Sequence, residues 1–159
     1  MRSLAKVLIP GPVLVGVLTG GAAMVPAMDG SQVVEDRAAV MKQQAKDLGS
    51  VKAYFTGKGD QAAAAAAATH LTRTTRKIPD LFPPGSGAAS PDGKFAPKAE
   101  IWSQWDKFLA AQKNAAAKAD ALLAAVESRG KAEIQAAFAD LGKNGCGGCH
   151  EHFRAKLKD

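Results

Sequence analysis

The sequence predicts an all-α fold, an antiparallel four-helix bundle in up-down-up-down order. Apolar residues recur at steps of three and four through four segments, which is the repeat of a helix with one buried face. Glycine or proline residues separate these segments, and no alternating strand pattern appears. Two of the three links are short, and short links make consecutive helices antiparallel neighbours. The length of 159 residues suits one domain.

Residues 1–27 have the pattern of a secretory signal peptide, which leaves residues 28–159 as the folded domain. Arg2 and Lys6 form a positive start, and the apolar stretch from Val7 to Leu18 leads into small residues. That stretch is shorter than the roughly 20 residues of a membrane span. We therefore expect no stable membrane insertion, with an uncleaved anchor as the alternative.

The first helix is expected from about Ser31 to Thr56, with Asp29 or Ser31 as its cap and Gly57 as its end. Its inward stripe contains an unexpected arginine and a methionine. The stripe residues are Val34, Arg37, Ala38, Met41, Ala45, Leu48 and Phe55.

The second helix is expected from Gln61 to about Lys77, with Asp60 as its cap. Residues 62–68 are seven consecutive alanines. Alanine has the highest helix propensity, and its small side chain lets a neighbouring helix come close. His70 lies on this helix, and we expect it to be solvated or hydrogen-bonded.

A proline-rich connection over residues 79–97 precedes the third helix, because its five prolines exclude a regular helix. A connection of this length usually covers a functional site, with a plain surface crossover as the alternative. The third helix is expected from about Lys98 to Ser128. Gly130 ends that segment, and the fourth helix is expected from Lys131 to near Lys158.

The fourth helix contains Cys146-Gly147-Gly148-Cys149-His150, the attachment signature of a c-type haem. At about 100° per residue, the two thiols and the imidazole share a helical arc of roughly 100°. A thioredoxin-like pair lacks its βαβ setting, a zinc site lacks four ligands, and a structural disulfide leaves His150 without a role. The motif predicts a covalent haem c with His150 as an iron ligand.

The second axial ligand decides the function, and Met41 is the candidate that the mature chain retains on an inward face. A thioether bound to iron raises the reduction potential of a His-ligated haem. The alternative is that Met41 only fills space in the core. If nothing binds the sixth position, nitric oxide or carbon monoxide can bind there.

The formal charge of +6 falls to +4 without the signal peptide, because 19 basic and 15 acidic residues remain. This charge is too small, and too evenly spread, to indicate nucleic-acid binding. It allows weak attraction to acidic redox partner proteins. No general acid, general base or substrate pocket is evident, so we do not expect an enzyme.

The chain resembles the class II c-type cytochromes, the cytochrome c-prime family. The haem motif lies near the C-terminus and continues to Arg154. The first helix has Arg37 four residues before Met41, and the third opens with Glu100-Ile101-Trp102-Ser103. Lys42, Lys52 and Gly57 also stand at the family's spacing.

The resemblance implies a haem in the bundle core, between the first and fourth helices, with His150 on its proximal side. It places Met41 over the distal face, as in the low-spin branch of electron carriers, and Arg37 near a haem propionate. It also implies export to the periplasm, where such haems are attached. Family members often pair through their first two helices, which leaves a monomer and a homodimer both open.

Overall fold

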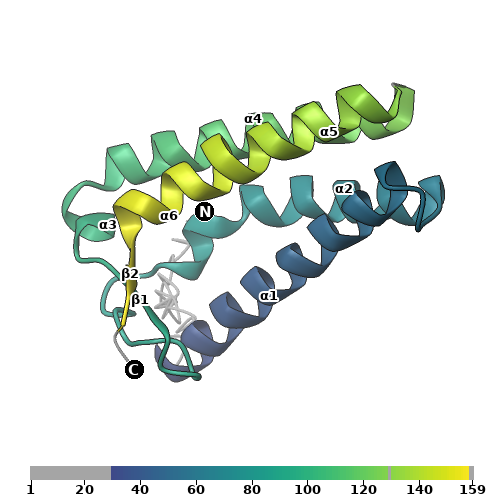
Figure 1. Cartoon of the computed structure of the whole chain (residues 1–159). Helices are drawn as coiled ribbons and strands as arrows, with labels where there is room; N and C mark the ends of the chain where they lie inside the picture. The colour runs from purple at the N-terminus through teal and green to yellow at the C-terminus, as the bar shows by residue number, and fades with distance from the viewer. Residues whose placement is uncertain (1–29, 129, 158–159) are drawn as a thin grey trace, which may run out of the picture.

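The structure is a computed structural model that describes residues 30–128 and 130–157. The predicted signal peptide and Asp29 lie outside these ranges. Four long helical segments make an antiparallel bundle (Figure 1), which confirms the predicted fold class. Its helices are α1 (Gly30–Phe55), α2 (Gln61–Arg76), α4 (Trp105–Ser128) and α5 (Lys131–Asp140), the last continued by the π-helix η2 (Leu141–Gly147) and by α6 (Gly148–Phe153).

The bundle is closed at one end and open at the other. α2 packs against both α1 and α4, and α4 packs against α5 and η2. Towards its N-terminal end α1 diverges from α5 and α6, as Figure 1 shows. The open end is the end at which the Cys-x-x-Cys-His motif lies.

The predicted cap of α2 is confirmed, because the Asp60 carboxylate accepts a hydrogen bond of 2.8 Å from the backbone N–H of Ala63. Gly57 ends the preceding helix region with a φ of +78°, a conformation that favours glycine. The alanine run then packs into the core, where Ala64 and Ala68 are fully buried. The larger buried neighbours in this cluster are Val51, Leu71, Leu122, Val126, Ile134 and Leu141.

The prediction of one continuous third helix is wrong, because this segment forms two separate helices. A short helix α3 (Glu100–Ser103) precedes α4, and Gln104 between them leaves the helical region with φ −128° and ψ 45°. Ile101 of α3 and Phe108 of α4 belong to the same buried aromatic cluster.

The predicted end of the fourth helix at Lys158 is also wrong. The helix stops at Phe153, and the chain continues as the extended strand β2 (Arg154–Lys156). This strand pairs antiparallel with β1 (Phe95–Pro97), so Pro97 lies opposite Arg154. Three residues are too few to show an alternating pattern, so these strands could not be predicted from the sequence.

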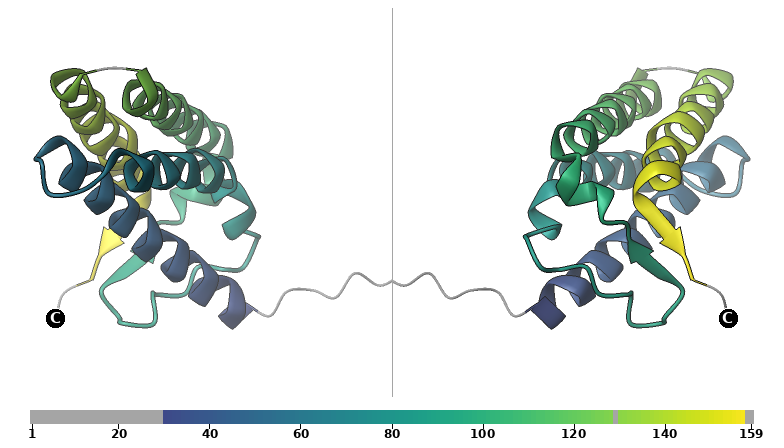
Figure 2. Two further views of the ribbon diagram at one scale, coloured as in Figure 1. Left: turned by 90° about the vertical axis from the view of Figure 1, so that its right-hand side faces the viewer. Right: turned by 90° about the vertical axis from the view of Figure 1, so that its left-hand side faces the viewer.

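The proline-rich connection crosses the open end of the bundle. It begins with the 3₁₀ turn η1 (Ile78–Leu81) and continues through residues 86–97, which we call the strap. The strap lies between α1 and the C-terminal end of the fold (Figure 2). In residues 30–128 and 130–157 there is no helix with the length and hydropathy of a membrane span.

Replacing Leu122 by Ala should lower the free energy of unfolding by about 2–5 kcal/mol, because it leaves a cavity in a core that alanines cannot refill. Chemical denaturation followed by circular dichroism measures this change. The control is Leu123→Ala at a neighbouring half-buried position, which should lose clearly less. Equal losses would contradict the placement of the core.

Candidate functional site

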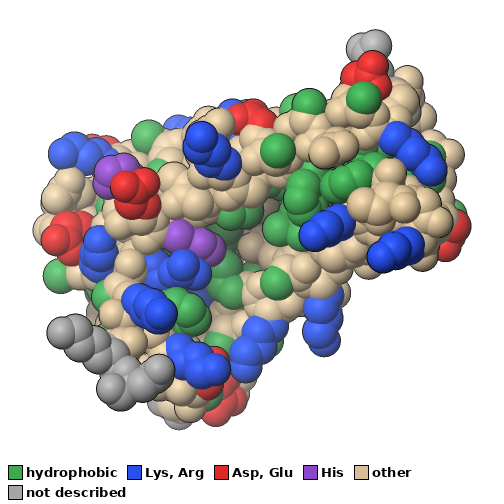
Figure 3. All heavy atoms as spheres, in the orientation of Figure 1, with side chains coloured by type: hydrophobic (Ala, Val, Ile, Leu, Met, Phe, Trp, Pro, Cys, Tyr) green, Lys and Arg blue, Asp and Glu red, His purple; other side chains and the backbone are tan. Residues whose placement is uncertain are grey.

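A cavity of about 420 Å³ occupies the open end of the bundle, a volume in the usual range for cofactor pockets. α1, the strap, α4 and the motif segment all contribute to its wall. In the space-filling view a hollow opens between these elements, and a histidine and several basic side chains lie near its rim (Figure 3). Its apolar wall includes Val34, Ala38, Ala45, Leu48, Ile78, Phe82, Ile101, Phe108, Ala115 and Phe153.

Cys146, Cys149 and His150 all line this cavity, as their shared helical face predicts. Cys146 lies in η2, and the other two lie in α6. A π-helical turn widens the helix and is frequent at functional sites. The two thiols are free, so the structure contains no disulfide between them.

Burial controls the ionisation of the motif. Loss of solvent raises the pKa of the Cys149 thiol to about 11, with a smaller contribution from Cys146, and it also raises the pKa of Cys146. Loss of solvent, with a smaller effect of the positive Arg154, lowers the pKa of His150 to about 4. At neutral pH the imidazole is therefore uncharged, which is the form that binds a metal.

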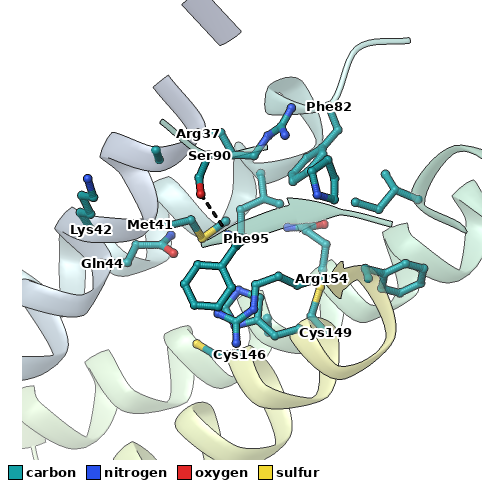
Figure 4. Close-up of a pocket in the computed structure, with 18 of the residues that line it drawn as sticks. Arg37, Met41, Lys42, Gln44, Phe82, Ser90, Phe95, Cys146, Cys149 and Arg154 are labelled. Atoms are coloured by element: carbon teal, nitrogen blue, oxygen red, sulfur yellow. Dashed lines mark hydrogen bonds between the residues drawn. The ribbon is translucent and has the colours of Figure 1, made fainter. Parts of the chain in front are cut away.

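Met41 contributes to the wall of the same cavity from α1. In Figure 4 its thioether reaches from α1 towards the space that Cys146 and Cys149 face from the motif helix. The structure thus brings together the two residues predicted as iron ligands, Met41 and His150, on different helices around one apolar space.

Arg37 also lines the cavity, and its side chain is 9% exposed. Its Nε donates to the carbonyl of Leu81 at 3.1 Å, and its Nη2 donates to the carbonyl and the hydroxyl of Ser86 at 2.9 Å each. The guanidinium also lies 4.2 Å from the ring centroid of Phe82. Burial lowers the pKa of Arg37 from its ordinary value.

The sequence did not single out the strap residues that line the cavity. These are Ser90, Asp92, Phe95, Ala96 and Pro97. Arg154 also reaches the cavity, and its guanidinium lies 4.4 Å from the ring centroid of Phe95. The length and proline content of the connection were the only signal that it covers a site.

Three buried polar residues, Gln44, Thr75 and Gln112, also line the cavity, and so does the exposed Lys42. Gln44 donates to the Thr74 hydroxyl at 3.0 Å, and Gln112 donates to the carbonyl of Thr75 at 2.9 Å. Because these polar groups bond to one another, they do not make the cavity polar.

The remaining histidines lie outside the cavity wall. His70 forms a 2.6 Å contact through Nδ1 with the Asp47 carboxylate, which agrees with the prediction of a hydrogen-bonded surface residue. His152 is exposed. In the described part of the chain, no three His, Cys, Asp or Glu side chains are grouped to hold a metal ion by themselves, so the zinc alternative has no site there.

Comparison with known proteins identifies the family. The family model described as "Cytochrome C'" matches residues 32–154. The chain belongs to the cytochrome c' family. It is 34% identical to a cytochrome c-556 of Agrobacterium tumefaciens over 125 residues, which are 77% of this chain and 97% of the relative. It is 36% identical to a cytochrome c' of Cereibacter sphaeroides over 133 residues, which are 82% and 87% of the two chains.

Solved structures of cytochromes c' share the fold. The cytochrome c' of Rubrivivax gelatinosus superposes with a TM-score of 0.69 at 28% identity, over 80% of this chain and 98% of that one. The cytochrome c' of Thermochromatium tepidum gives 0.71 at 25% identity, over 81% and 98%. Both likenesses span nearly the whole of the related chain.

Members of the cytochrome c family carry covalently attached haem c, and Cys146 and Cys149 fit its Cys-x-x-Cys-His motif. The site fits this cofactor on its own chemistry. Two half-buried free thiols and a neutral imidazole line one apolar cavity, and basic side chains lie at its edge. The cofactor of this chain is therefore haem c.

Gly145→Ala should lower the free energy of unfolding by about 1–3 kcal/mol through overpacking. A Cβ at this position would lie 3.0 Å from Cδ1 of Leu141 and 3.4 Å from Cα of Ala115, so the buried Leu141 side chain would have to shift by a few tenths of an ångström in a closely packed contact between η2 and α4. Denaturation of the haem-loaded protein measures the loss.

Gly142→Ala is the matched control in the same π-helix, because a Cβ there meets no heavy atom within 4 Å. It should be neutral, or stabilising by up to about 1 kcal/mol. A loss at Gly142 as large as that at Gly145 would show that η2, and not its contact with α4, is the sensitive feature.

Proposed function

We propose that this chain is a periplasmic cytochrome that carries single electrons on a six-coordinate haem c. His150 is its proximal axial ligand and Met41 its distal one. The observation that carries this proposal is the position of Met41 on α1, in the wall of the cavity that His150 and the two cysteines also line. When bound, the haem supplies the one-electron redox chemistry.

The surroundings of both ligands support electron transfer. An imidazole and a thioether are both uncharged ligands, and this pair favours the reduced iron, giving a high potential. The apolar wall excludes water and works in the same direction, because a dry site disfavours the extra positive charge of the oxidised iron. No substrate chemistry is needed for this role, and we propose that the protein is not an enzyme.

Arg37 and Arg154 are the proposed partners of the negatively charged haem propionates. Both line the cavity, and a guanidinium can bind a carboxylate through two parallel hydrogen bonds. The hydrogen bonds of Arg37 to Leu81 and Ser86 involve Nε and Nη2. Its Nη1 has no acceptor among the described residues, which keeps a donor for a propionate.

Export, redox partner proteins and a homodimer belong to the same proposal. Residues 1–27 support export, since they have the order of charge, apolar stretch and small residues that a signal peptide requires. The modest positive charge supports acidic partners. Sedimentation of the mature protein distinguishes a monomer from a homodimer.

A five-coordinate haem that binds nitric oxide or carbon monoxide is the second candidate. The observation that favours it is the small size of the cavity residues beside Met41. Ala38 and Ala45 lie about one turn before and after it. They leave space next to the thioether, so a diatomic gas would have room if Met41 did not bind the iron.

Met41→Leu should convert the oxidised haem from low-spin to high-spin without detaching it, because leucine keeps the bulk and removes the sulfur. The midpoint potential should fall. Changes of axial ligand set haem potentials over a range of about 0.8 V, and the fall should lie within that range. Optical spectra of both oxidation states and a redox titration measure these changes, and carbon monoxide should bind the reduced variant readily.

The control for this variant is Leu48→Ala, which changes another half-buried side chain of α1 in the cavity wall. It should leave the haem low-spin. If the spectrum of Met41→Leu equals that of the unmodified protein, Met41 is not a ligand. If both oxidised proteins are then high-spin, the gas-binding candidate replaces the electron carrier.

A further inference from the structure

We propose that the strap holds the haem pocket closed, and that Phe95 is its positioning residue, because its ring fixes the Arg154 guanidinium at the edge of the pocket. The inference rests on the covalent haem and deepens the proposed function. It does not depend on the number of axial ligands. The strap connects the two helices between which the haem is proposed to lie.

The first end of the strap is attached to α1. Ser86 is buried, and it accepts two hydrogen bonds from Arg37, one at its carbonyl and one at its hydroxyl, both 2.9 Å long. The Ser86 hydroxyl also donates to the carbonyl of Pro83 at 2.8 Å. A buried guanidinium holds its acceptors strongly, because breaking these bonds would leave a charge unpaired away from water.

The second end of the strap is attached to the segment that follows the haem motif. β1 pairs with β2, and two backbone hydrogen bonds of 2.9 Å extend the ladder, from the N–H of Lys98 to the carbonyl of Phe153 and from the N–H of Leu157 to the carbonyl of Lys94. The strap thus crosses from the helix of Met41 to the end of the helix of His150.

The turn in the middle of the strap presents Phe95 in a fixed position. The N–H of Ser90 donates to the carbonyl of Phe95 at 2.8 Å, and the N–H of Phe95 donates to the Ser90 hydroxyl at 3.2 Å. Gly93, with φ +69°, and the Asp92 carboxylate, which accepts from the Ser90 hydroxyl, complete the turn. The strap is therefore ordered by its own hydrogen bonds.

The Phe95 ring connects the turn to the haem site. Phe95 is half-buried in the cavity wall, and Arg154 places its guanidinium 4.4 Å from the ring centroid. A cation over an aromatic ring is held by about 0.5–1 kcal/mol at an exposed site. Arg154 is otherwise exposed, so the Phe95 ring and the proposed propionate contact are what hold its guanidinium at the pocket edge. Without the ring the charge is held less closely and water gains access to that edge.

The test compares three variants of the haem-loaded protein. Phe95→Leu keeps an apolar side chain and removes the ring, whereas Phe95→Tyr keeps the ring. Phe138→Leu is the matched control, because Phe138 is also half-buried and makes an edge contact with Phe55 at the opposite end of the bundle.

Hydrogen exchange at the amides of Lys98 and Leu157 reports whether the strap is held, and the midpoint potential reports the charge and water near the haem. Phe95→Leu should raise both exchange rates about two- to fivefold, the factor that corresponds to one cation–π contact. Its midpoint potential should fall, because the positive charge of Arg154 is held less closely to the haem and water enters. Phe95→Tyr and Phe138→Leu should change neither.

A double variant makes the result specific. Arg154→Gln removes the same contact from the other side, so Phe95→Leu added to it should cause no further fall in potential. Additive falls, unchanged exchange in Phe95→Leu, or equal effects in Phe138→Leu would each overturn the proposal. The exchange readout does not depend on Met41, so a failed Met41 ligation and a failed strap are told apart.

Discussion

A gap wide enough for a flat cofactor has to stay open between α1 and α6 in a bundle whose other helices pack closely. The alanines of α2 bring its neighbours together at the closed end, where Ala64 and Ala68 are fully buried. At the open end an aromatic cluster with Phe82, Phe108 and Phe153 supports the cavity instead. The remaining features of the site depend on which residues line this gap and on which contacts keep the helices on its two sides in place.

Burial in that gap sets the charge state of each polar group. The same loss of solvent that raises the pKa values of the two thiols lowers the pKa of His150, so every group of the motif is neutral at pH 7. Arg37 is buried and charged, and the structure satisfies its charge with carbonyl and hydroxyl groups of the connection. A neutral lining with charged groups at its border suits a cofactor whose ring is apolar and whose propionates are not.

Features that depend on residues close together in the chain could be predicted from the sequence, and features that depend on distant residues could not. The Asp60 cap, the helical stripes and the motif spacing belong to the first kind, because each step in them joins residues within about one turn of each other. The pairing of β1 with β2 and the contact between Phe95 and Arg154 depend on segments far apart in the chain. For this region the sequence indicated only that a long proline-rich connection covers a functional site.

The early end of the motif helix has a consequence for the haem site. In a helix continued to Lys158, Arg154 would lie one turn beyond His150 on the same face. Because Arg154 is extended instead, its backbone joins the strap and its side chain meets Phe95. The strap is therefore bonded to the motif segment through β2 and to α1 through Arg37. In our proposal the closure of the pocket rests on this segment, whereas the second iron ligand is Met41 of α1.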